Sequence, residues 1–203
     1  KRTRVEQLAQ KKKLEKSRVN RARVLVKLDK KIRTREEKLQ LYRADARQLE
    51  TLMDGLRDAL ADVPANAGQR KPFKSQRGRL RLPVRGKITA NYGSRRKAVG
   101  VRWQGVMIRA KQGADVKTVS HGRVAFADWL RGFGLMVIID HGDGYMSLYG
   151  HNESLYVETG DWVEAGDVVS AVGSSGGQKR AGLYFEIRAN GKPTNPLRWC
   201  KSR

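Results

Sequence analysis

The sequence is poor in the residues that most often build disulfides, metal centres and membrane spans. A single cysteine, Cys200, excludes an internal disulfide. Only three histidines are present, His121, His141 and His151, and none forms a His-x-His or an i, i+4 pair. A catalytic metal such as zinc needs about three His, Asp, Glu or Cys ligands at one point. No run of about 18 apolar residues exists, so no segment is expected to span a membrane as a helix.

Proline and glycine are scarce in the first third of the chain. Residues 1–62 contain no proline and one glycine, whereas all five prolines and the other 20 glycines follow. Lys, Arg, Leu, Glu and Ala dominate this stretch, and all of them favour helix. We therefore expect a helical arm at 1–62 and an aperiodic linker at 63–80. The domain at 81–203 shows short apolar alternations between glycines, which predict an all-β fold.

From Leu25 onward the apolar residues of the arm follow a heptad pattern. The stripe consists of Leu25, Leu28, Ile32, Arg35, Leu39, Tyr42, Ala46, Leu49, Met53, Leu56 and Leu60, and only Arg35 is not apolar. Alternating steps of three and four predict a helix packed along a partner, as in a coiled coil. Thr34-Arg35-Glu36-Glu37 matches a capping box that would begin a new helix at residue 35. The pattern leaves open one continuous helix, one bent helix or two helices.

Acidic residues are outnumbered throughout, and the net charge is +23. Residues 1–80 hold 24 Lys and Arg against 10 Asp and Glu, and residues 81–203 hold 19 against 10. Such a surplus suits a polyanionic partner. The basic first 80 residues contain only Tyr42 and Phe73 as aromatics, so we do not expect nucleic-acid binding. The opening Lys1-Arg2-Thr3-Arg4 is typical of a helix interior, so we expect the chain to be part of a longer protein.

The β half contains a series of ordered motifs. They are Leu82-Pro83-Val84-Arg85-Gly86-Lys87-Ile88-Thr89, Gly113-Ala114-Asp115-Val116, Ile139-Asp140-His141-Gly142-Asp143-Gly144-Tyr145, Leu148-Tyr149-Gly150-His151, Val172-Gly173-Ser174-Ser175-Gly176 and Leu183-Tyr184-Phe185-Glu186. Through these motifs, residues 82–198 resemble the lysostaphin/LytM-type zinc peptidases, which cleave peptidoglycan. The expected fold class is therefore α+β in two parts. A coiled-coil arm precedes an antiparallel LytM-type domain that is similar to a duplicated hybrid motif.

The resemblance also shows which chemistry is missing. Active members hold zinc with a His-x-Gly-x-Asp motif and the second histidine of a late His-x-His. These ligand positions fall on Trp103, Met107 and Tyr184. Of the two histidines that assist catalysis in the family, one is replaced by Gly182 and the other remains as His151. Trp, Met and neutral Tyr are poor zinc ligands, and without a metal no bound water is acidified for attack on an amide. We expect no catalytic residue, no metal and no cofactor.

The degenerate site predicts a binding groove. Alternation along a strand places Tyr184, Glu186 and Arg188 on one face, and by the same rule Tyr149 and His151 share a face. Aromatic, Met and Arg side chains are enriched in interface centres. The predicted groove consists of Trp103, Met107, Phe133, Met136, Tyr149, His151, Tyr184 and Arg188. The alternative for each of these residues is simple packing in the core.

A LytM-type domain without zinc ligands behind a basic helical arm resembles the EnvC family of murein hydrolase activators. Residues 124–135 and 183–188 carry this likeness most clearly. It implies a periplasmic factor at the division septum that activates N-acetylmuramoyl-L-alanine amidases through the groove, with peptidoglycan as a further partner. It also implies contact of the coiled coil with the FtsE–FtsX complex, and a helix that masks the groove. Because the heptad stripe is joined to the groove by a short linker, we expect residues 35–62 or their neighbours to mask it in the resting state. The alternatives are a peptidoglycan-binding module and an active zinc endopeptidase.

Overall fold

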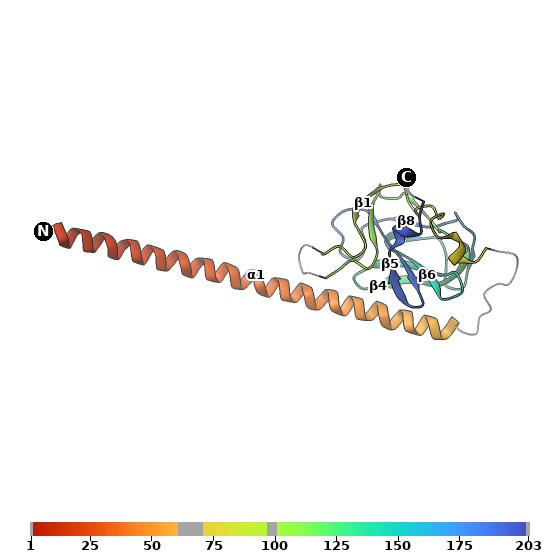
Figure 1. The fold of residues 1–203 in the computed structure, drawn as a ribbon, viewed down its shortest axis with the longest axis horizontal. Coiled ribbons are helices and arrows are strands. Elements are labelled where there is room, and N and C mark those ends of the chain that lie inside the picture. The colour runs from red at the N-terminus through yellow and green to blue at the C-terminus, as the bar shows by residue number, and fades with distance from the viewer. Residues whose placement is uncertain (1, 61–70, 97–100, 202–203) are drawn as a thin grey trace. The chain divides into compact units, whose positions relative to one another are not determined.

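The computed structural model describes residues 2–60, 71–96 and 101–201. The chain divides into two compact units, residues 1–41 and residues 42–203. Figure 1 shows the elements in chain order. They are α1 (Arg2–Leu60), the 3₁₀ helix η1 (Phe73–Gln76), β1 (Lys87–Ala90), β2 (Val106–Arg109), β3 (Asp115–Lys117), β4 (Gly122–Leu130), β5 (Gly134–Asp140), β6 (Tyr145–Leu155), β7 (Trp162–Val163), β8 (Val168–Val172), β9 (Leu183–Ala189), β10 (Lys192–Thr194) and the 3₁₀ helix η2 (Pro196–Arg198).

The arm forms one helix rather than two. Helix α1 runs without interruption from Arg2 to Leu60, so the capping-box sequence at Thr34 does not begin a new helix. The segment contains no proline, and strong helix formers flank Thr34 on both sides. In the first unit, Leu25, Leu28 and Ile32 of the heptad stripe are exposed. Among the described residues, no helix combines the length and the apolarity that a membrane span requires.

The β half is one antiparallel sheet, as the alternation of apolar residues predicts. Ten strands within the described residues form this sheet, with the order β1-β2-β9-β6-β5-β4-β7. Strand β10 extends β9, and β8 joins β3 to β6. The neighbouring strands β2, β9 and β6 carry Met107, Tyr184 and His151 respectively, so these motif positions lie side by side in the sheet.

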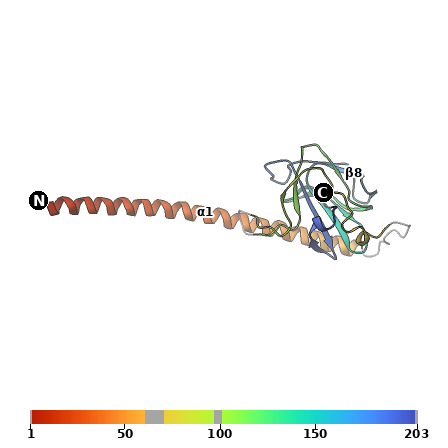
Figure 2. The same ribbon diagram turned by 45° about the horizontal axis from the view of Figure 1, so that its top comes forward.

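Two apolar clusters form the core of the second unit, and β9 alternates between them. Leu183, Phe185 and Ile187 belong to the larger cluster, the main core. Tyr184 belongs to the second cluster, as the two-residue period of a strand requires. The C-terminal part of α1 contributes Leu49 to that second cluster. Figures 1 and 2 show this orange stretch of α1 beside the strands.

Part of the stretch that was expected to be a linker is anchored in the main core. Phe73 is fully buried, and its ring stacks on His141 at 4.5 Å and on Tyr145 at 5.3 Å between centroids. The Trp199 ring lies 5.0 Å away in a tilted arrangement. Leu80 forms a parallel bridge to Cys200 near the C-terminus. Residues 71–80 therefore pack on the β domain, whereas residues 61–70 lie outside the described part of the chain.

Candidate functional site

The three positions aligned with the family's metal ligands meet in space. Met107 on β2 is the direct cross-strand partner of Tyr184 on β9. The ring centroids of Trp103 and Tyr184 lie 6.2 Å apart. A Cβ atom placed on Gly182 would lie 3.3 Å from the Met107 Cε atom. The substituted residues therefore occupy one site, which fits the motif alignment.

These residues do not fit a zinc ion. Across residues 2–60, 71–96 and 101–201, no group of three or more His, Cys, Asp or Glu side chains could hold a metal. The Trp103 indole has no lone pair for a metal, and the Met107 thioether is a weak donor. Tyr184 uses its hydroxyl proton in a hydrogen bond to Glu186 Oε2. Burial, followed by the nearby Glu186 charge, raises the Tyr184 pKa well above its usual value, so the phenol stays neutral.

His151 is buried beside this site as a neutral ring. Its Nδ1 atom lies 3.0 Å from the Ser175 carbonyl oxygen, and its Nε2 atom lies 3.1 Å from Gln178 Nε2. These contacts suit a ring that donates from Nδ1 and accepts at Nε2. Its centroid lies 6.5 Å from Phe133 and 6.2 Å from Tyr184. Burial lowers the His151 pKa to about 4, so the imidazole carries no charge at neutral pH.

The expectation that Tyr149 shares a face with His151 is wrong. Tyr149 is fully buried in the main core, where its hydroxyl accepts hydrogen bonds from the Val119 amide at 3.1 Å and from Ser147 Oγ at 2.8 Å. His151 adopts a positive φ of 66°, which breaks the strand alternation between the two residues. The remaining residues of the predicted groove lie together, and we refer to them as the groove face. It consists of Trp103, Met107, Phe133, Met136, His151, Tyr184 and Arg188.

The groove face is covered by the C-terminal part of α1. Leu49 is 0% exposed and Met53 is 3% exposed, and both belong to the same cluster as Met107, Met136 and Tyr184. Leu52 and Leu56 pack against this cluster from the same helix. We refer to residues 42–56 of α1 as the cover segment. It binds the groove face in the manner of an amphipathic helix in a groove.

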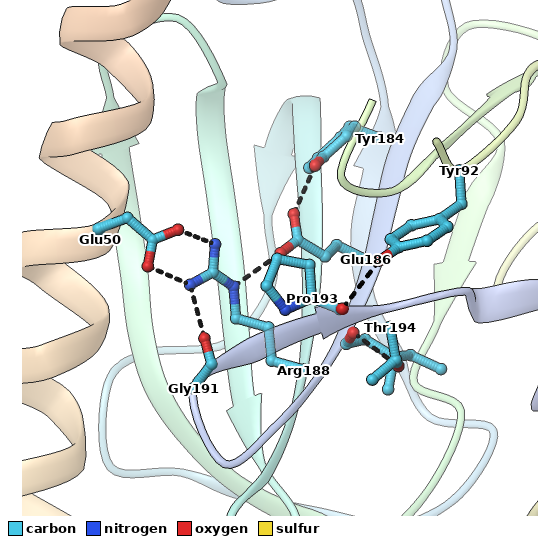
Figure 3. Close-up of polar contacts among 9 residues, drawn as sticks. Glu50, Tyr92, Tyr184, Glu186, Arg188, Gly191, Pro193 and Thr194 are labelled. Atoms are coloured by element: carbon cyan, nitrogen blue, oxygen red, sulfur yellow. Dashed lines mark hydrogen bonds and ion pairs between the residues drawn. The ribbon is translucent and has the colours of Figure 1, made fainter. Parts of the chain in front are cut away.

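A buried ionic chain joins the cover segment to the centre of the groove face (Figure 3). Arg188 is fully buried, and its two terminal nitrogens donate to the two Glu50 carboxylate oxygens at 3.0 and 2.9 Å. Arg188 Nε donates to Glu186 Oε1 at 2.6 Å, and Glu186 accepts from the Tyr184 hydroxyl at its other oxygen. Arg188 also donates to the Gly191 carbonyl oxygen at 3.2 Å. The guanidinium is thus saturated with acceptors only while Glu50 is in place.

The electrostatics of this chain depend on burial. Burial raises the Glu186 pKa, and the Arg188 charge and the Tyr184 hydrogen bond act in the opposite direction. Removing one partner of such a chain leaves a charge that is poorly solvated, which is costly. The side chain of Glu50 is 44% exposed, so water reaches this member of the chain, whereas Arg188 and Glu186 are fully buried.

Two further contacts fix the cover segment at its N-terminal end. Asp45, which is 6% exposed, accepts from Arg131 Nε at 2.9 Å in the turn between β4 and β5. The Arg96 guanidinium stacks between two rings, 4.7 Å from the Tyr42 centroid and 3.7 Å from the Trp103 centroid. Arg96 thereby places a positive charge above the residue that replaces a metal ligand, and burial lowers its pKa.

Sequence reasoning missed the polar residues that bind the cover segment to the groove face. Asp45 and Glu50 lie beside apolar positions of the heptad stripe and have the appearance of solvated charges. Arg96 lies in a short basic run, Arg95-Arg96-Lys97, that carries no periodic signal. A weak hint was available for Arg188, because a predicted inward-facing arginine needs a carboxylate partner. The role of the groove face in binding an amidase stays a prediction.

The chain is similar to a peptidase family and to two murein hydrolase activators. Residues 101–196 match the family model described as peptidase family M23. The murein hydrolase activator EnvC of Escherichia coli (strain K12) is 49% identical over 123 residues, which are 61% of this chain and 29% of that protein. The murein hydrolase activator NlpD of the same strain is 36% identical over 124 residues, 61% of this chain and 31% of that protein. The chain thus spans less than a third of the length of these two relatives.

Solved structures agree on the fold. The catalytic domain of lysostaphin from Staphylococcus simulans has a TM-score of 0.52 at 27% identity, with 55% of this chain and 90% of that chain covered. Csd3 of Helicobacter pylori has a TM-score of 0.54 at 28% identity, with 61% of this chain and 35% of that chain covered.

Proposed function

Because residues 101–196 form a domain of peptidase family M23 that is homologous to the murein hydrolase activators EnvC and NlpD, we propose that this protein activates a cell-wall hydrolase and cleaves no bond itself. The observation that carries the proposal is the groove face. At the three ligand positions, Trp103, Met107 and Tyr184 offer apolar contact surface in place of metal ligands. Such a surface, with a buried arginine at its edge, suits protein recognition better than hydrolysis.

The cover segment indicates what kind of partner this face binds. A helix with apolar residues at positions 49, 52, 53 and 56 fills the face and buries its Met and aromatic side chains. A hydrolase that docks through an amphipathic helix would bury the same surface. Since the cover segment and the partner use one face, they compete for it. The resting protein is therefore masked, and activation requires that the cover segment leave.

The proposal extends to the identity of the partner, the compartment and the trigger. The proposed partner is an N-acetylmuramoyl-L-alanine amidase of the division septum, which places the protein in the periplasm. The proposed trigger is the FtsE–FtsX complex acting through the coiled coil. This trigger is supported by Leu25, Leu28 and Ile32 of α1, whose exposed side chains continue the heptad stripe and need a partner.

Dye release from labelled peptidoglycan sacculi tests the proposal directly. The chain alone is expected to release no dye, and a purified division amidase alone is expected to release little. A mixture of the two is expected to release much more. Release by the chain alone that a chelator abolishes would show an active zinc endopeptidase. Sedimentation with sacculi but no effect on any amidase would favour a peptidoglycan-binding module.

A pair of variants shows whether the groove face is the surface that acts. Phe133→Ser introduces a hydroxyl into the groove face, where Phe133 is 9% exposed. Trp162→Ser removes an aromatic ring of β7 that is 49% exposed and outside the groove face. The first variant is expected to lose activation, and the second is expected to keep it. Thermal unfolding of both variants separates lost binding from lost folding.

A further inference from the structure

A second concave surface lies at residues 79–85, β3 and the turn at 165–166, and none of the groove-face residues lines it. The cavity has a volume of about 840 Å³. Leu80, Val84 and Val119 line it, and all three belong to the main core rather than to the cluster under the cover segment. A ligand in this cavity would therefore not contact the groove face.

Positive charge is concentrated around this cavity. Five cationic side chains line it, with a single carboxylate. The cations are Arg79, Arg81, Arg85, Lys117 and Lys201, and the acid is Asp115. All five cationic residues are exposed. None of their side chains forms an ion pair or hydrogen bond with any residue in the described part of the chain.

This arrangement has no evident role in holding the fold together. Like charges on one rim repel each other, which costs stability. Elsewhere in the second unit, Arg131 and Arg188 are matched by carboxylates. A concave surface with apolar walls and unmatched cations raises the local concentration of anions. The geometry fits a ligand that has anionic groups attached to an apolar or ring-shaped body.

We propose that this cavity binds a carboxylate-bearing segment of peptidoglycan, namely its stem peptide. Arginine binds carboxylates through two parallel hydrogen bonds, and three arginines line the cavity. A volume of this size accommodates a short stretch of polymer. The recessed shape suits a chain that enters the cavity better than a flat lipid surface. The choice of peptidoglycan rests on the proposed function, whereas the anion site rests on the cavity alone.

Sedimentation of the full chain with purified sacculi tests the site. The variant Arg79→Gln, Arg81→Gln, Lys117→Gln removes three rim charges. The matched control Lys179→Gln, Arg180→Gln, Lys192→Gln removes three exposed charges outside the cavity. We expect the rim variant to bind sacculi about tenfold more weakly, and the control to stay within about twofold of the unmodified chain. A soluble stem peptide is expected to compete, and its amidated form is not.

Each other outcome overturns the proposal. An equal loss of sacculus binding in both variants would show that net charge alone causes the effect. Unchanged sacculus binding by the rim variant would show that this cavity is not the binding site. If the chain bound phosphatidylglycerol vesicles as tightly as sacculi, and the rim variant lost this binding, the ligand would be a lipid phosphate. Amidase activation in solution, measured with soluble peptidoglycan fragments, is a separate readout. If activation fails while the rim-dependent binding persists, the proposed function is wrong and the anion site stands.

Discussion

Replacing Leu49 with alanine tests whether the cover segment holds the groove face closed. Leu49 is fully buried at the centre of the contact, yet it is not part of the groove face. Alanine is a better helix former than leucine, so α1 itself remains helical. The substitution therefore weakens the contact of the cover segment and leaves the residues of the groove face unchanged.

The size of the effect follows from the lost side chain. Leucine-to-alanine changes at buried positions cost about 2–5 kcal/mol. The lower part of this range applies here, because the vacated space is at a helix–sheet contact that can readjust. A cost of about 2.5 kcal/mol raises the ratio of open to closed molecules about 70-fold. While the open fraction stays small, a partner that needs the open groove face gains the same factor in apparent affinity.

Two measurements on the same helix check this expectation. Amide hydrogen exchange of residues 42–60 should accelerate in Leu49→Ala, and binding of a purified division amidase should tighten by a similar factor. Leu41→Ala is the matched control, because it makes the same change on the same helix at a side chain that is 52% exposed. If Leu49→Ala and Leu41→Ala behaved alike in both measurements, the cover segment would not control access. Faster exchange without tighter binding would refute competition for one surface.

Three further predictions address charge and pH. Glu50→Gln leaves Arg188 with fewer acceptors, which should cost the closed state about 1.5 kcal/mol and raise the ratio of open to closed molecules about tenfold. Unchanged amide exchange of residues 42–60 would contradict this. Arg96→Ala removes the stacked cation, worth about 1 kcal/mol, and should raise the ratio of open to closed molecules about fivefold; amide exchange equal to that of the unmodified chain would contradict this. Burial lowers the pKa of His141 and His151 to about 4, so the unfolded chain binds more protons between about pH 4 and 6.5. Stability should therefore fall as the pH falls, by about 2 kcal/mol for each histidine between pH 7 and 5. Urea unfolding at both pH values checks this, and His151→Asn should remove half of the loss.

Much of the fold is readable from local patterns. Glycine-punctuated alternation predicts the antiparallel sheet, and the two-residue period of Leu183–Ala189 assigns its side chains to the correct faces. The same rule fails at Tyr149, because it holds only while every residue of a strand is extended. His151 has a positive φ, and a register shift lies between Leu135 and Val137 on the neighbouring strand. Neither feature has a signature in the sequence.

The covering of the site is harder to predict than the site itself. The heptad stripe predicts that α1 packs on some partner, but any apolar surface satisfies that pattern. The partner is specified by polar pairs such as Glu50 with Arg188, which are 138 residues apart in sequence. A contact between residues so far apart in sequence produces no periodic pattern from which it could be predicted. Phe73 was missed for a similar reason, because one buried ring in a Lys- and Gln-rich stretch does not change its composition.

The burial of Phe73 limits how far the cover segment can move from the β domain. Only residues 61–72 separate the end of α1 from the buried Phe73 ring. Even at full extension, a connection of this length reaches no more than about 45 Å. A detached cover segment therefore remains near the groove face at a local concentration on the order of a millimolar. A free partner at micromolar concentration would compete with a cover segment whose local concentration stays higher, so brief openings would reverse. Under the proposed function, lasting activation would therefore require that α1 be held away from the groove face.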